Sequence, residues 1–129
     1  MEELAVPTDI LKGAKVLIVE DEPFIALDIS YSVEQAGGVP LGPATTVAEA
    51  LKILKTEWPD GAIVDVDLPD GTIEPVLNAL CPAVPVVVHT GVGLPDIMRQ
   101  AHPNLEVFNK PTSPDFLVLR LGLTDRSRG

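Results

Sequence analysis

Short runs of apolar, mostly β-branched residues recur along this chain, and a stretch with helical character follows each of them. The clearest run is Lys15–Val19, and similar runs occupy residues 62–64 and 84–88. Residues 106–108 are expected to form a last short strand. Continuous apolar runs of this length are typical of strands that are buried on both faces of a parallel sheet. Val39–Ala44 is interrupted by two prolines, which predicts a weaker strand near a sheet edge.

Helix signals lie between the predicted strands. Pro23 and Pro114 each suit the first turn of a helix, and the apolar stripe that begins at Phe24 ends at two glycines, residues 37 and 38. Thr46 and Glu49 form a capping-box pattern, and we expect the helix that it opens to reach about residue 58. Shorter helices are expected over residues 73–80 and 94–101. A strand and a helix repeated five times predict an α/β domain, doubly wound, with helices on both faces of a parallel sheet.

Length and composition fit one globular domain. The 129 residues are enough for a single hydrophobic core, and we expect a leader over residues 1–13, a folded domain over 14–122 and a polar tail over 123–129. No apolar run approaches the ~20 residues of a membrane span, and the N-terminus lacks the basic region of a signal peptide. With the lone Cys81, these features predict a cytoplasmic protein that does not bind membranes.

The net charge of the chain restricts its partners. It is −10 at pH 7, with only nine basic residues. Affinity for nucleic acids depends on neutralising phosphates with lysine and arginine, so we expect no nucleic-acid binding. The acidic balance favours a protein partner or a cation.

Polar side chains stand just past four of the predicted strands. They are the acidic pair Glu20-Asp21, then Asp65, Thr90 and Lys110. Each has an ordinary explanation when taken alone, because acids cap helices, threonine starts turns and lysine is a common surface residue. In an open parallel sheet, however, sites form outside the carboxyl ends of the strands. The sequence therefore predicts that these residues meet at one edge.

Three acids follow the central apolar run at short intervals: Asp65, Asp67 and Asp70. A buried carboxylate without a partner costs several kcal/mol, roughly, so acids at the end of a core strand need a compensating interaction. A divalent cation such as Mg2+ provides one, because it prefers hard oxygen ligands. The alternative is that residues 67–71 form only a polar turn.

The sequence resembles the receiver domain of the response regulators of bacterial two-component systems, and the resemblance covers residues 14–122. Residues 17–22 are similar to the family's first strand and acidic pair, and residues 63–69 to its phosphoacceptor strand, with a proline four positions beyond the acceptor. Residues 88–91 match the strand-four hydroxyl followed by a small residue, and residues 109–111 match the lysine-proline pair at strand five. The resemblance implies a flavodoxin-like fold with strand order 2-1-3-4-5.

The resemblance also implies a chemistry. Asp65 would accept a phosphoryl group, as an acyl phosphate, from a sensor histidine kinase or a histidine phosphotransfer protein. Thr90 would donate a hydrogen bond to the new phosphate, and Lys110 would contact a phosphoryl oxygen. One Mg2+ ion would be held by Glu20, Asp21, Asp65 and the backbone carbonyl of Asp67.

On this interpretation the chain is a single-domain response regulator. It would signal by contact with a downstream protein target or by phosphorelay. It would be no enzyme beyond self-catalysed phosphorylation and dephosphorylation.

Several positions depart from the family pattern. Glu20 replaces the more usual aspartate, and Val107 stands where an aromatic residue is usual, with Phe108 one residue later. Thr90-Gly91 and the missing aromatic are similar to the FATGUY subgroup of receivers, whereas His89 differs from that pattern. Without the ring at position 107, we expect residues 91–102, which are rich in glycine and proline, to carry the response to phosphorylation.

Two other classes of protein remain open from the sequence. The spacing of Asp65 and Asp67 also resembles the nucleophile motif of haloacid-dehalogenase-type phosphatases, with Thr90 and Lys110 as later partners. That alternative leaves Glu20-Asp21 unexplained. The other class is a pseudo-receiver, which has this fold but is a binding module that is never phosphorylated.

Overall fold

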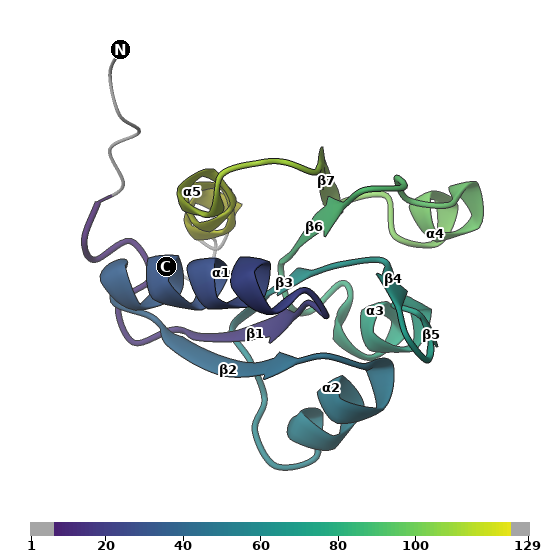
Figure 1. Ribbon diagram of the computed structural model, residues 1–129, viewed down its shortest axis with the longest axis horizontal. Helices are drawn as coiled ribbons and strands as arrows, with labels where there is room; N and C mark the ends of the chain where they lie inside the picture. The colour runs from purple at the N-terminus through teal and green to yellow at the C-terminus, as the bar shows by residue number, and fades with distance from the viewer. Residues whose placement is uncertain (1–6, 125–129) are drawn as a thin grey trace.

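A computed structural model describes residues 7–124 of the chain (Figure 1). Five parallel strands form one sheet in the order β2-β1-β3-β6-β7, which confirms the predicted order 2-1-3-4-5. These strands are β1 (Lys15–Val19), β2 (Val39–Ala44), β3 (Gly61–Val64), β6 (Val86–Thr90) and β7 (Glu106–Asn109). The helices are α1 (Pro23–Gln35), α2 (Val47–Leu54), α3 (Glu74–Leu80), α4 (Asp96–Ala101) and α5 (Pro114–Thr124). Val39–Ala44 lies at a sheet edge, as its prolines indicate.

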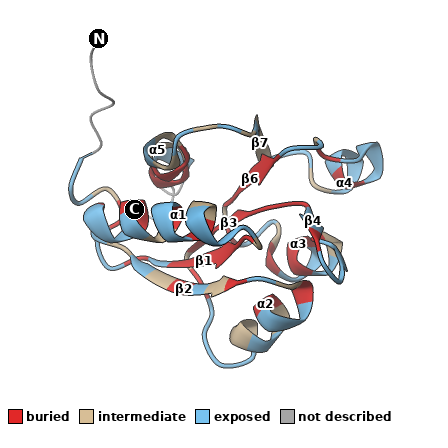
Figure 2. Cartoon of the chain, viewed as in Figure 1, coloured by how far each residue is buried: buried red, intermediate tan, exposed pale blue. Residues whose placement is uncertain are grey.

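The sheet separates two hydrophobic cores. Alternate residues of β1 point to opposite faces, so Leu17 and Val19 pack into one core while Val16 and Ile18 pack into the other. Helices α1 and α5 cover one face of the sheet, and α2 and α3 cover the other (Figure 1). Burial on both faces explains why the central strands are apolar without alternation, and the buried residues concentrate along them (Figure 2).

Helix α2 is shorter than the sequence predicts. It ends at Leu54, four residues before the expected limit near Trp58, which lies about half exposed. Pro59 disfavours the helical conformation at the residue before it, which is one reason the helix stops early. The Thr46 hydroxyl accepts a hydrogen bond from Glu49 N at 3.0 Å, as a capping box requires. The Glu49 carboxylate, however, accepts from Thr45 N at 2.7 Å and not from Thr46 N.

An antiparallel hairpin follows the central strand. Its two short strands are β4 (Asp67–Leu68) and β5 (Gly71–Thr72). The sequence predicts only a turn here. Leu68 is buried in the core on the α2 and α3 side of the sheet, which gives the hairpin one apolar anchor.

The ends of the described chain pack on the domain. Residues 7–13 form turns, and Leu11 is buried between α1 and α5, with its N–H bonded to Ala36 O at 2.9 Å. Helix α5 continues to Thr124, two residues into the expected tail. Residues 1–6 of the expected leader and 125–129 of the expected tail lie outside the described residues. Between residues 7 and 124 no helix combines the length and apolar character needed to cross a membrane.

Candidate functional site

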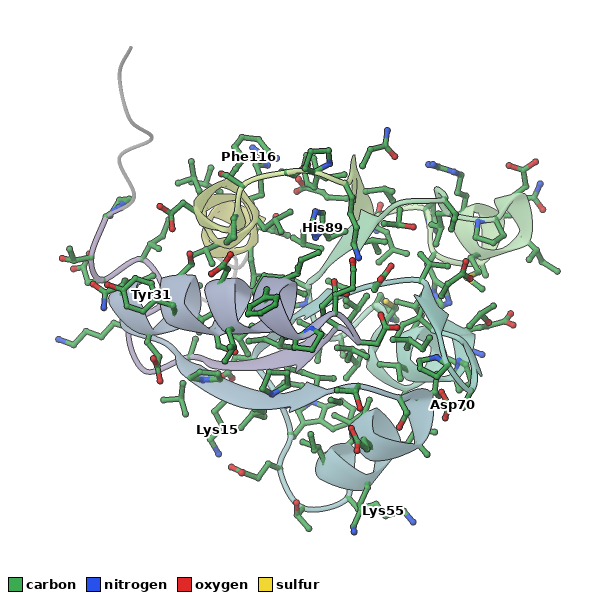
Figure 3. All side chains as sticks on the ribbon, viewed as in Figure 1. Lys15, Tyr31, Lys55, Asp70, His89 and Phe116 are labelled. Carbon is green, nitrogen blue, oxygen red and sulfur yellow. The ribbon has the colours of Figure 1, made fainter. Side chains whose placement is uncertain are left out.

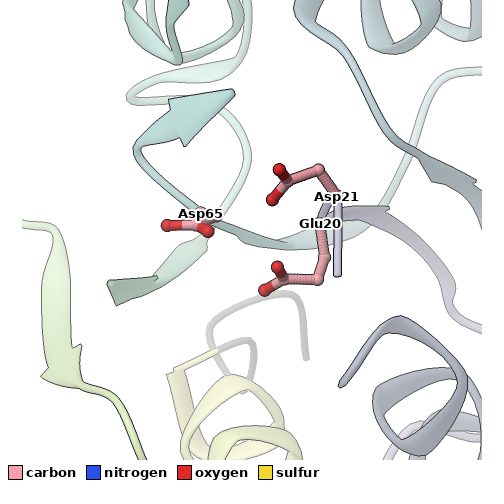
Figure 4. Close-up of side chains that lie close together, drawn as sticks. All are labelled: Glu20, Asp21 and Asp65. Atoms are coloured by element: carbon pink, nitrogen blue, oxygen red, sulfur yellow. The ribbon is translucent and has the colours of Figure 1, made fainter. Parts of the chain in front are cut away.

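Three acids predicted at the carboxyl edge of the sheet lie together (Figure 4). Glu20 follows β1 and Asp65 follows the neighbouring strand β3, where Asp65 N donates to Val19 O at 2.9 Å. Carboxylate oxygens of Glu20, Asp21 and Asp65 lie within 4.8 Å of one another. Glu20 and Asp65 are buried, and burial in particular raises the pKa of Glu20.

Lys110 joins this cluster from the turn after β7. Its Nζ lies 2.9 Å from Asp65 Oδ2 and 3.1 Å from Glu20 Oε2, and Glu22 stands further off at 3.8 Å. Burial opposes the charge of this lysine, but its hydrogen bonds to Asp65 and Glu20 outweigh burial and raise the pKa of Lys110. The Lys110 ammonium therefore forms ion pairs with two buried carboxylates, and the pocket retains a net negative charge.

Thr90 is placed at the end of β6, in the strand between those of Asp65 and Lys110. It is fully buried, and its carbonyl accepts a hydrogen bond from Lys110 N at 2.8 Å. Its hydroxyl accepts from Val92 N at 3.1 Å, so it is engaged in the turn after the strand and not with Asp65. Thr90 is thereby connected both to Lys110 and to the start of the segment 91–102.

Asp67 and Asp70 are not part of the carboxylate cluster. Asp67 lies exposed on β4, opposite Thr72, and the expected role of its backbone carbonyl stays a prediction. Asp70 is a helix cap: its carboxylate accepts from Val47 N at 2.8 Å and Ala48 N at 3.0 Å, and these bonds lower the pKa of Asp70. The sequence gives no local signal for this cap, because donors and acceptor are more than 20 residues apart.

His89 is a further buried polar group beside the site, and no motif in the sequence indicates a role for it. Its Nε2 accepts a hydrogen bond from Thr112 N at 3.3 Å, two residues beyond Lys110, and its Nδ1 is buried without a partner among the described residues. Burial, followed by the charge of Lys110, lowers the pKa of His89. The ring is therefore held neutral, with Nε2 as the acceptor.

The residues of the pocket fit a magnesium ion. Glu20, Asp21 and Asp65 offer only oxygen donors, which are the ligands that Mg2+ prefers. Two of these carboxylates are buried and share a single lysine, so a further cation would offset the remaining charge.

Fold and site together define an α/β domain with an acidic pocket at the carboxyl edge of a parallel sheet. This is the fold of a CheY-like response regulator receiver domain protein from Methanospirillum hungatei, with a TM-score of 0.78 and 22% identity over 92% of this chain and 100% of that one. The response regulator PhyR from Brucella abortus has a TM-score of 0.68 and 27% identity, over 93% of this chain and 53% of its own.

Comparison of the sequence with known proteins also finds a response regulator of the PhyR type. The phyllosphere-induced regulator PhyR of Methylorubrum extorquens is 32% identical over 109 residues, which are 84% of this chain and 38% of the relative. No family model matches the chain. The chain is similar to response regulator receiver domains in fold and in sequence, and it spans well under half the length of this curated relative.

Proposed function

We propose that the chain accepts a phosphoryl group on Asp65 from a sensor histidine kinase or a histidine phosphotransfer protein, in a reaction that depends on Mg2+. It would pass the signal on by contact with a downstream protein or by phosphorelay, in the cytoplasm. The observation that carries the proposal is the placement of Asp65: a buried carboxylate, bonded to Lys110 and flanked by the carboxylates of Glu20 and Asp21.

The hydrogen bonds of Asp65 suit a nucleophile. Its Oδ1 accepts from Val66 N at 2.7 Å and its Oδ2 from Lys110 Nζ at 2.9 Å, so the carboxylate is held in one orientation. In the transfer, a carboxylate oxygen bonds to phosphorus as the bond to the donor's imidazole nitrogen breaks. That nitrogen keeps the electron pair. Lys110 would then contact a phosphoryl oxygen, and Thr90 would donate its hydroxyl hydrogen to another.

A bound Mg2+ would supply charge neutralisation for the phosphoryl group during transfer. The residues proposed to hold it are Glu20, Asp21, Asp65 and the backbone carbonyl of Asp67. Glu20 is longer than the aspartate usual at its position, and its Oε2 already reaches both Lys110 Nζ and the N–H of Glu22. We expect it to contact the ion through a water molecule.

The phosphatase alternative fits the site less well. It assigns roles to Asp65, Asp67, Thr90 and Lys110 but none to Glu20, whose carboxylate is buried against the same lysine as that of Asp65. Asp67, which that motif requires as a second functional acid, is exposed and outside the cluster. The pseudo-receiver alternative differs from the proposal in whether the chain can be phosphorylated at all, which a phosphorylation experiment decides.

The proposal is tested with a small-molecule phosphodonor such as acetyl phosphate, in the presence of Mg2+. Intact mass and peptide mapping should show one phosphoryl group on Asp65, and Asp65→Asn should abolish it. Asp67→Asn is the matched control, because it changes an exposed acid two residues away and keeps the backbone carbonyl. A phosphoryl group on Asp67 in the Asp65→Asn variant would overturn the assignment, and no phosphorylation of the unmodified chain would identify a pseudo-receiver.

A further inference from the structure

Asp70 connects the hairpin after the central strand to a different part of the domain. It lies in the turn between β4 and β5, where the hairpin approaches α2 (Figure 3). One carboxylate oxygen bonds to Val47 N at 2.8 Å and the other to Ala48 N at 3.0 Å, the first two N–H groups of α2. Both groups are donors that no helix can satisfy internally, and a carboxylate is also favoured there by the helix dipole.

The hairpin has few other contacts that fix its position. Each of its strands has two residues, and such a short antiparallel pair is not stable by itself. Its base is held by Ile73 N, which donates to Val66 O at 2.9 Å, and by the buried side chain of Leu68. The residues beyond Leu68, up to Thr72, are exposed, so the two bonds of Asp70 are what ties this outer half to the domain.

Helix α2 depends on Asp70 less than the hairpin does. The Thr46 hydroxyl caps the same end of the helix by accepting from Glu49 N, and Thr46 O accepts from Ala50 N at 3.1 Å. Loss of Asp70 would leave the Val47 and Ala48 N–H groups to water, while the Thr46 cap would stay in place. The same loss would release the outer half of the hairpin, residues 69–72, which pairs with Asp67 through Thr72.

We propose that Asp70 is a positioning residue for the metal site: by bonding to α2, it holds the hairpin where the backbone carbonyl of Asp67 can serve as a ligand. This inference rests on the proposed function, because it assumes that Mg2+ binds at Glu20, Asp21 and Asp65. It makes the start of α2, more than 20 residues away in sequence, part of what determines affinity for the ion.

The test compares Asp70→Ala with Thr46→Ala, which removes another cap of the same helix but leaves the hairpin untouched. Mg2+ affinity is measured by isothermal titration calorimetry on the full chain without phosphodonor. We expect the dissociation constant of Asp70→Ala to rise about tenfold, the scale typical when a residue that orients a metal ligand is lost. The Mg2+ dissociation constant of Thr46→Ala should stay within about twofold of that of the unmodified chain.

A second measurement follows the hairpin directly. Without Mg2+, exchange of the Ile73 amide should speed up in Asp70→Ala and not in Thr46→Ala. Asp70→Asn keeps one oxygen acceptor, so it should give an intermediate dissociation constant and serves if the alanine variant does not fold.

Equal Mg2+ affinities of Asp70→Ala and the unmodified chain would overturn the inference and leave the proposed function intact. Equal weakening by Thr46→Ala would also overturn it, because the effect would then belong to α2 and not to the hairpin. Absence of Mg2+ binding by the unmodified chain would overturn the proposed function itself.

Discussion

Replacing Lys110 with alanine should expose the electrostatic cost of the acidic pocket. The lysine side chain is 18% exposed, whereas the side chains of its partners Glu20 and Asp65 are only 2% and 7% exposed. In the Lys110→Ala variant these two carboxylates would face each other without a cation in contact. Water reaches these two buried carboxylates poorly, so the free energy needed to keep their negative charges buried lowers the stability of the folded state.

The size of the loss follows from the burial of the partners. Removing one member of a fully buried ion pair costs about 3–5 kcal/mol, and the partial exposure of Lys110 lowers our expectation to about 3 kcal/mol. For a domain of this size, that corresponds to a fall in Tm of about 10 °C. Lys15→Ala is the matched control: its ion pair with Glu57 spans 3.5 Å with both side chains about half exposed. We expect that variant to lose less than about 1 kcal/mol.

The pH dependence of the loss gives a second check. Burial already raises the pKa of Glu20, and without the lysine this pKa should rise further. A carboxyl group whose pKa is higher in the folded state than in the unfolded state binds more protons when folded. Its destabilising effect is therefore absent below the unfolded value, near 4.5, and grows as the pH rises through the folded value. The difference between Lys110→Ala and the unmodified chain should shrink as the pH is lowered from neutrality.

Thermal unfolding monitored by circular dichroism, with EDTA present, measures these quantities. Addition of Mg2+ should restore much of the lost Tm, because an ion that binds only the folded state stabilises it by mass action. A Lys110→Ala variant whose Tm in EDTA at neutral pH equals that of Lys15→Ala would refute the reasoning. It would mean that water reaches Glu20 and Asp65 far more freely than their burial indicates.

Two further predictions concern residues beside the pocket. Thr90→Ala should still be phosphorylated, because the Thr90 hydroxyl bonds to Val92 N and not to Asp65. The conformational change that follows phosphorylation should be smaller in this variant. Amide exchange over residues 91–102, with and without beryllofluoride and Mg2+, would show a smaller gain in protection than in the unmodified chain; an equal gain would contradict this role. His89→Leu should flatten the fall in stability between about pH 7 and pH 5.5. Burial lowers the pKa of folded His89, so the unfolded chain, where the pKa is near its ordinary 6.5, binds more protons in this range. Urea unfolding at the two pH values measures it, and an unchanged slope would show that His89 does not cause the fall.

Most of the fold could be predicted because its strongest signal is local. Residues 16–19 and 84–88 are apolar throughout, a pattern typical of strands that are covered on both faces. The site followed from the same regularity, since Glu20, Asp65 and Lys110 each come directly after a strand. Parallel strands bring their carboxyl ends to one edge whatever the details of the helices, which is why the position of these residues in the chain was sufficient.

What the sequence did not predict depends on contacts between distant segments. The apolar stripe of α1 suggested a single buried face, but Phe24 and Leu27 are 82% and 61% exposed. The buried face is formed instead by residues such as Ala26 and Ile29, which face the sheet and α5. The cap that Asp70 makes on α2 is of the same kind. An aspartate before a glycine indicates a turn, and nothing within several residues of it reveals the helix that it contacts.

The contacts of β7 indicate which residues would transmit a conformational change from Asp65 to the rest of the domain. Val107 packs into the core on the α2 and α3 side of the sheet, and it has no ring to move. Phe108 points to the opposite face, where its ring stacks edge-on against Phe116 at 5.3 Å, so it is not available in place of Val107. Lys110 is the residue next to β7 that connects Asp65 to the neighbouring strand, because its Nζ bonds to Asp65 and its N–H bonds to the carbonyl of Thr90. A phosphoryl group that draws Lys110 and the Thr90 hydroxyl toward itself would break the bond from Val92 N, and the segment that follows would be the first to respond.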